Sequence, residues 1–204
     1  MTTVIALRHG ETDWNAERRL QGWAPTPLND RGREQAESAG IHLAATYDFD
    51  RILASDLRRT HETATLVREA GIEPDPILDR AWRERDFGVY QGLTYETMSD
   101  EYPEFSAERS GQSALAETPE RGESLIDLRE RIVDAFERLT DDAIDETVLV
   151  VTHGGPLYAL FSQVTDREYL DLITGESQAN CAVNEFRVDD GITVVRANDT
   201  SYRE

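Results

Sequence analysis

The sequence has no lysine, a single cysteine and no long hydrophobic run. The lone Cys181 excludes an intrachain disulfide and a metal cluster built on cysteines. No apolar stretch is long enough to span a membrane. Residues 1–3 carry no basic side chain, and the apolar run at 4–7 is too short for a signal peptide. We therefore expect a cytoplasmic protein that does not enter a membrane.

Acidic residues outnumber basic ones by 41 to 21, which gives a net charge of −20. All the basic residues are arginines. A lysine-free acidic surface is typical of a halophilic protein, because dense salt screens the self-repulsion that such a charge causes. The alternative is an ordinary acidic protein from a GC-rich genome that prefers arginine codons. Either way, the charge argues against binding to nucleic acid or to an anionic membrane.

Short buried strands alternate with helical patterns along the 204 residues. Apolar runs without polar spacers, at 4–7, 52–54 and 148–151, are typical of buried parallel strands. Alternating patterns at 183–188 and 193–196 predict a hairpin at the end of the sheet. The fold class is therefore α/β: we expect a three-layer α/β/α sandwich with a mostly parallel central sheet.

Four polar or proline signals mark where the helices should begin. Asn29 and Ser55 are good N-caps, with Asp56 in the first turn after Ser55. Ser124 opens a capping box, and Pro156 fits the first turn of the helix that follows the third strand. Each predicted helix then carries an apolar stripe that can pack on the sheet.

The segment 77–122 has the least regular pattern. Glycines interrupt an aromatic stretch, and no long helical or alternating pattern appears. We expect this segment to be a small cap, with short helices, inserted over the site. The whole chain, 1–204, is expected to form a single domain.

Three of the buried strands end in residues suited to an oxyanion. Arg8 and His9 follow the first, Arg59 lies just after the second, and His153 follows the third. Ligands in open α/β sheets bind beyond the carboxyl ends of the strands. Helix N-termini and arginine forks both favour phosphate there. Convergence of these groups in a chain of net charge −20 predicts an anion-binding site.

Other interpretations of these histidines are open. A single buried histidine is more often a satisfied structural residue than a functional one. His9 and His153 could also bind a metal, but their neighbours are arginine, glycine and threonine rather than carboxylates with ligand spacing. We therefore predict no metal and no cofactor.

The segment 7–15, which reads LRHGETDWN, resembles the signature of the histidine phosphatase superfamily, also called the phosphoglycerate mutase-like family. The similarity continues in order along the chain, in segments 20–23, 27–29, 55–64, 83–93, 122–124, 151–155 and 198–200. One departure is Pro25, where the family commonly has aspartate. That departure concerns substrate contacts rather than the chemistry.

The resemblance implies a set of catalytic roles. His9 would attack phosphorus and become phosphohistidine, while Arg8, Arg59 and His153 hold the phosphoryl oxygens. Glu84 would protonate the leaving alkoxide and then help to deprotonate water. Without the resemblance, we would interpret Glu84 as a surface residue that forms ion pairs with the neighbouring Arg83 and Arg85.

Four further residues are expected to contact the phosphate or the substrate. Asn15 and the backbone near Gln21 and Gly22 would supply neutral donors, and Gly154 would let the backbone approach the ligand. The implied partner is a small phosphorylated metabolite.

The function expected from the sequence is a phosphatase acting through phosphohistidine. One alternative is a bisphosphoglycerate-dependent phosphoglycerate mutase. It is disfavoured because the cap between Gly92 and Pro119 is short and holds only Arg109 as a cation for a substrate carboxylate. Another is a non-catalytic phospho-ligand binding protein on this fold, although such proteins typically lose the nucleophile or the acid.

Overall fold

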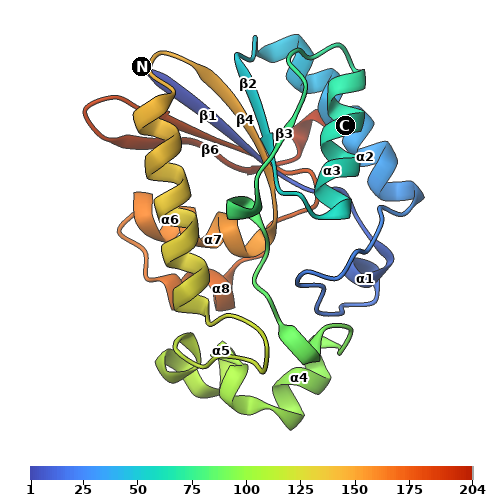
Figure 1. Ribbon diagram of the computed structural model, residues 1–204, viewed down its shortest axis with the longest axis vertical. Coiled ribbons are helices and arrows are strands. Elements are labelled where there is room, and N and C mark those ends of the chain that lie inside the picture. The colour runs from blue at the N-terminus through green and yellow to red at the C-terminus, as the bar shows by residue number, and fades with distance from the viewer. Residues whose placement is uncertain (204) are drawn as a thin grey trace.

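The computed structural model describes residues 1–203 and has the α/β/α architecture expected from the sequence (Figure 1). One six-stranded sheet has the order β3-β2-β4-β1-β5-β6. The strands are β1 Thr2–Arg8, β2 Arg51–Ala54, β3 Ile77–Leu78, β4 Thr147–Thr152, β5 Val183–Val188 and β6 Ile192–Asp199. The first four are mutually parallel, and the last two form the predicted antiparallel hairpin at the sheet edge.

Helices cover both faces of this sheet. The main helices are α2 Asp30–Thr46 and α3 Arg58–Glu69 on one face, and α6 Leu125–Asp142, α7 Gly154–Val164 and α8 Tyr169–Gly175 on the other. Alternate residues of β1 serve the two cores: Ile5 and Leu7 pack with α2 and α3, whereas Val4 and Ala6 pack with α6 and α7. Burial on both faces explains why β1 and β4 are apolar without interruption.

Most of the predicted helix starts are confirmed. The Asn29 side chain accepts a hydrogen bond from Gly32 N at 2.8 Å, and Ser124 forms a capping box with Asp127. The prediction for Ser55 is wrong. Helix α3 begins only at Arg58 with Leu57 as its N-cap, so Ser55 and Asp56 lie before the helix in the loop that leaves β2. The Ser55 hydroxyl instead contacts a histidine of the site described below.

Segment 77–122 does not leave the sheet as early as expected. Ile77–Leu78 pair in parallel with β2 and form the edge strand. A strand of two residues is too short to leave a recognisable pattern in the sequence. Short helices follow at the lower end of Figure 1, namely α4 Tyr95–Glu101, α5 Ala107–Ser110 and several 3-10 turns. Helix α1, Asp13–Ala16, lies in the loop after β1.

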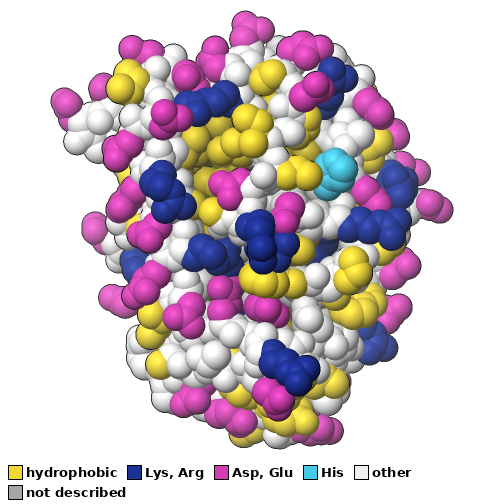
Figure 2. All heavy atoms as spheres, in the orientation of Figure 1, with side chains coloured by type: hydrophobic (Ala, Val, Ile, Leu, Met, Phe, Trp, Pro, Cys, Tyr) yellow, Lys and Arg dark blue, Asp and Glu magenta, His cyan; other side chains and the backbone are white. Residues whose placement is uncertain are grey.

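Charge is unevenly placed on the surface. Acidic side chains are scattered over the face seen in Figure 2, whereas arginines gather across its middle. Among residues 1–203, no helix is long and apolar enough to cross a membrane.

Candidate active site

The carboxyl ends of β1, β2 and β4 bring two imidazoles and a guanidinium together. His9 follows β1, His153 follows β4, and their ring centroids lie 5.1 Å apart. Arg59, in the first turn of α3, places its Nε 3.2 Å from His9 Nε2. All three side chains are almost completely buried. The predicted convergence of these residues is confirmed.

Hydrogen bonds define the tautomer of His9. Its Nδ1 lies 2.7 Å from the carbonyl oxygen of Gly10, which can only accept, so Nδ1 carries the proton. Nε2 is then unprotonated and accepts from Arg59 Nε. The carbonyl of His9 accepts from Asn180 Nδ2 at 3.0 Å, which holds the backbone on the other side. His9 thus presents a fixed lone pair on Nε2.

Both histidines are held in the neutral form. Burial, followed by the nearby guanidiniums of Arg59 and Arg8, places the pKa of His9 well below its ordinary value of 6.5. Burial and Arg59 lower the pKa of His153 in the same way. Burial also lowers the pKa of Arg59, to about 10, which leaves this guanidinium protonated at neutral pH. The site is therefore cationic around two neutral rings.

Arg59 is anchored by neutral groups. Its Nη2 donates to the carbonyl of Gly22 at 2.8 Å, and Nη1 donates to that of Ala24 at 3.3 Å. Gly22 has φ +51°, a conformation that favours glycine. The carbonyl of Gly22 thus fixes the arginine, and its N–H stays a predicted donor to the ligand.

Two buried nitrogens in the site have no hydrogen-bond partner among residues 1–203. Arg8 donates through Nη1 to the carbonyl of Gln178. Its Nε, however, is buried without a hydrogen-bond partner among residues 1–203, and so is Nδ1 of His153. Leaving a buried polar group unpaired typically costs about 1–3 kcal/mol. Nε of an arginine can only donate, so an acceptor-rich ligand would satisfy it.

Glu84 lies at the N-terminus of α7. One carboxylate oxygen accepts from Gly155 N at 3.2 Å, and the other accepts from Arg85 N at 2.8 Å. A Cβ at position 155 would collide with Glu84 Oε1, so any larger residue there would have to displace the carboxylate. By contrast, a Cβ on Gly154 would meet its nearest neighbour, Arg8 Nε, at an ordinary 3.8 Å.

The loop that carries Glu84 is fixed by two side chains from elsewhere in the chain. Arg131 of α6 donates to the carbonyls of Ala81 at 2.8 Å, Arg83 at 3.0 Å and Glu84 at 3.3 Å. Trp23 Nε1 also donates to the Glu84 carbonyl, at 2.8 Å. These bonds restrain the backbone that positions the carboxylate.

Asn15 and Gln21, two further residues of the predicted site, differ in where their side chains lie. Asn15 lies beside the nucleophile loop, with Oδ1 accepting from Thr12 N and from Asn180 Nδ2 at 3.2 and 3.3 Å. Only its Nδ2 is left for a ligand. The Gln21 side chain turns into its own loop, where Oε1 accepts from Thr26 Oγ1 at 2.6 Å, and the backbone donor expected near Gln21 stays a prediction.

Sequence reasoning missed three residues that contact the site. Ser55 Oγ lies 2.9 Å from His153 Nε2, Asn180 holds His9, and Arg131 holds the Glu84 loop. Ser55 was noticed but assigned to a helix cap. The other two had no local signal, because each acts on residues far away in the chain.

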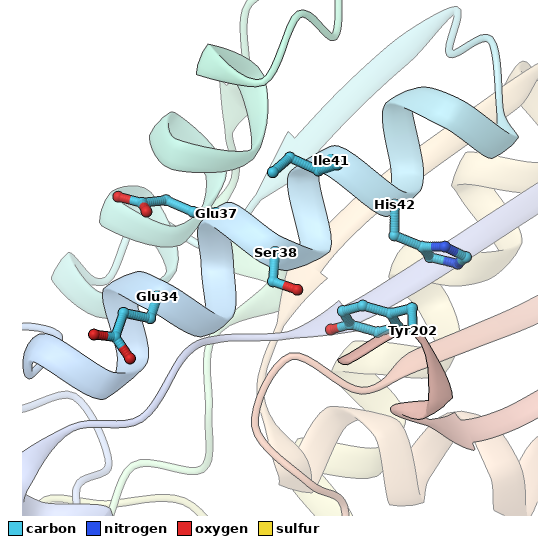
Figure 3. Close-up of a pocket in the computed structure, with 6 residues that line it drawn as sticks. All are labelled: Glu34, Glu37, Ser38, Ile41, His42 and Tyr202. Carbon is cyan, nitrogen blue, oxygen red and sulfur yellow. The ribbon is translucent and has the colours of Figure 1, made fainter. Parts of the chain in front are cut away.

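Two hollows are lined by residues other than these. One, of about 860 Å³, lies among the cap helices and includes Tyr95 and Arg109 in its lining. Figure 3 shows the other, a groove of about 360 Å³ between α2 and the C-terminal segment, lined by Glu34, Glu37, Ser38, Ile41, His42 and Tyr202. Carboxylates in this groove make it unsuited to an anion.

Among residues 1–203, no group of three or more His, Cys, Asp or Glu could hold a metal ion.

This arrangement defines an α/β protein with an oxyanion site built around a neutral histidine. Residues 4–200 match the model of the histidine phosphatase superfamily, branch 1. The chain belongs to this superfamily.

Curated relatives and solved structures agree with this membership. Phosphoglycerate mutase-like protein 4 of Arabidopsis thaliana is 36% identical over 92% of this chain and 80% of its own. A metal-independent phosphoserine phosphatase of the same plant is 36% identical over 81% and 69%. The structure of Bacillus stearothermophilus YhfR is 33% identical, with a TM-score of 0.89 and full coverage of both chains.

The neutral state of the two histidines predicts a pH dependence of stability. A histidine whose pKa is lower in the folded chain takes up protons preferentially when unfolded. Such a histidine does not lower the free energy of unfolding above pH 6.5, and it lowers it progressively as the pH falls below that value. Between pH 7.5 and 5.5, the free energy of unfolding should decrease by up to about 1.4 kcal/mol per pH unit for each of His9 and His153 once the pH is below 6.5.

Denaturant unfolding of the wild type and of the double variant His9→Gln/His153→Gln measures this dependence. The double variant keeps every other titrating group, so the difference between the two slopes belongs to these two rings. Equal slopes would contradict the assignment of two neutral buried histidines.

Proposed function

We propose that the protein is a phosphatase that hydrolyses a small phosphorylated metabolite through a phosphohistidine on His9. The observation that carries this proposal is a pair of buried nitrogens without a partner among residues 1–203, Arg8 Nε and His153 Nδ1, in the same site as the Nε2 lone pair of His9, to which Arg59 donates. A phosphoryl group supplies acceptors for Arg8 Nε–H and for a protonated His153 Nδ1, and the electrophile that the His9 lone pair attacks.

In the first step, His9 Nε2 attacks phosphorus in line with the leaving oxygen. Arg8, Arg59 and His153 stabilise the charge on the three equatorial oxygens as it redistributes. Because Nδ1 of His9 already donates to the Gly10 carbonyl, the positive charge that develops on the ring meets a fixed dipole. The P–O bond to the substrate breaks as the N–P bond forms.

Glu84 acts on the leaving group. Its carboxyl group donates a proton to the alkoxide, and the resulting carboxylate then takes a proton from the water that attacks phosphohistidine. The products are an alcohol and inorganic phosphate, and His9 returns to its starting form. The cationic side chains stabilise the transferred group in the way that a metal ion does in other enzymes.

Relatives support a phosphatase of this class. The metal-independent phosphoserine phosphatase of Arabidopsis thaliana shares 36% identity with the chain. A mycobacterial glucosyl-3-phosphoglycerate phosphatase, solved as a complex with VO3, shares 27% identity, with a TM-score of 0.78 over 97% of this chain and 99% of its own. Both names specify small phosphorylated substrates.

The cap favours hydrolysis over a mutase reaction. A phosphoglycerate mutase must hold the substrate carboxylate while the phosphoryl group returns. Arg109 is the one basic residue between 92 and 119, and its guanidinium pairs with Asp100 and donates to Ser99 Oγ. The cation predicted for a carboxylate is therefore already engaged.

We expect His9→Ala to abolish the phosphoenzyme. Wild-type protein mixed with ³²P-labelled phosphate ester and quenched should carry an acid-labile label, and the variant should carry none. A chelator should leave wild-type activity unchanged, because no step uses a metal. A labelled His9→Ala protein would overturn the nucleophile assignment, and loss of activity on chelation would overturn the metal-independent mechanism.

We expect Gly155→Ala to impair general acid catalysis selectively. The new Cβ displaces the Glu84 carboxylate, and misplacement by about 1 Å can cost roughly 100-fold. The kcat/KM for an alkyl phosphate should fall about 10- to 100-fold. That for p-nitrophenyl phosphate should change little, because p-nitrophenolate leaves without a proton.

Gly154→Ala is the matched control for this prediction. Its Cβ lies near Arg8 and not near Glu84, so any loss should be equal on the two substrates, and the ratio of their kcat/KM values should stay close to that of the wild type. Equal losses on both substrates in Gly155→Ala would contradict the role of Glu84.

We expect 3-phosphoglycerate not to be isomerised. Incubation with 2,3-bisphosphoglycerate and 3-phosphoglycerate, followed by ³¹P NMR, should show release of inorganic phosphate or no reaction. Formation of 2-phosphoglycerate that depends on the bisphosphate would establish the mutase instead.

A further inference from the structure

Ser55 occupies a fully buried position against His153. It lies between β2 and α3, where its backbone N donates to Val151 O at 3.0 Å and its carbonyl accepts from Thr60 Oγ1 at 2.9 Å. These bonds fix the residue independently of its hydroxyl. The hydroxyl oxygen lies 2.9 Å from His153 Nε2 and accepts a long hydrogen bond, at 3.4 Å, from Leu57 N.

The hydroxyl proton has one acceptor within reach. Leu57 N donates to Ser55 Oγ, so it cannot receive the proton. Among residues 1–203, His153 Nε2 is the remaining hydrogen-bond partner of Oγ. Donation from Oγ requires a lone pair on Nε2, and a neutral imidazole with a free Nε2 carries its proton on Nδ1.

The other ring nitrogen leads to the same tautomer. His153 Nδ1 is buried, has no partner among residues 1–203, and lies in a site that also holds the unpaired Nε of Arg8. A phosphoryl oxygen only accepts hydrogen bonds. An unprotonated Nδ1 would turn a lone pair towards that oxygen and repel it, whereas Nδ1–H binds it.

We propose that Ser55 is a positioning residue that keeps His153 in the Nδ1–H tautomer, so that Nδ1–H donates to the transferred phosphoryl group. The inference rests on the function proposed above and adds the atom through which His153 acts. His9 is in the same tautomer but uses its other nitrogen, the unprotonated Nε2.

The tautomer can be measured on the wild-type protein without turnover. Two-bond ¹H–¹⁵N correlation spectra distinguish protonated from unprotonated ring nitrogens. The chain has only four histidines, and a His153→Asn variant assigns the signal. We expect His153 Nδ1 in the protonated range and Nε2 in the unprotonated range, in the free protein and with vanadate bound. The opposite pattern would overturn the proposal, whatever the variants do.

Three variants then test the hydroxyl. Ser55→Ala should give a mixture of His153 tautomers and lower kcat roughly 10- to 100-fold, less than the ~10²- to 10³-fold that loss of a whole transition-state donor costs. Ser55→Thr keeps the hydroxyl and should restore the tautomer and most of the activity. Thr2→Val, which removes a buried hydroxyl at the start of β1, far from the site, should change neither.

Unchanged tautomer in Ser55→Ala would contradict the proposal, even if activity fell. Failure of the underlying function would look different. In that case the wild-type protein would form no phosphoenzyme, while the spectra would still report the state of His153.

Discussion

The site depends on one constraint: the imidazole of His9 must remain uncharged although guanidiniums lie against it. Burial removes water that would stabilise a charged ring, and Arg59 and Arg8 add repulsion, so His9 stays neutral. Neutrality leaves one lone pair, and the carbonyl of Gly10 determines that it is on Nε2. Protonation would remove that lone pair, so the proposed chemistry requires the same electrostatic environment that binds the anion.

The way in which the arginines are held preserves their charge for a ligand. Arg59 donates to the carbonyls of Gly22 and Ala24, and Arg8 donates to that of Gln178. A carbonyl fixes a guanidinium without neutralising it, whereas a carboxylate would do both. Carboxylates elsewhere do pair with arginines, as in the bidentate contact between Asp56 and Arg83. A chain of net charge −20 can thus keep a cationic centre by limiting the acceptors there to neutral groups.

Local patterns predicted the parts of this structure that depend on local physics. Uninterrupted apolar runs predicted β1 and β4, and side-chain caps predicted the starts of α2 and α6. Because strand ends in a parallel sheet share one edge, the meeting of His9 with His153 followed. Ser55 was misassigned because a serine before a helix is chemically a good cap, and only the tertiary fold shows that His153 competes for its hydroxyl. Asn180 and Arg131 act across 171 and 47 residues of sequence, where no local pattern reaches.

The two histidines also show why residue type alone does not assign a role. Both are buried, neutral and next to Arg59, so charge and burial do not distinguish the nucleophile from the donor. The difference lies in the partner of each ring. His9 donates from Nδ1 to the Gly10 carbonyl and keeps Nε2 unprotonated, as an acceptor for Arg59. His153 has a serine hydroxyl at Nε2, and its Nδ1 has no partner among residues 1–203. In the proposed mechanism, the hydrogen-bond partner of each ring therefore decides its role. The Gly10 carbonyl makes His9 the side chain that attacks phosphorus, and the Ser55 hydroxyl makes His153 the side chain that binds the phosphoryl oxygens.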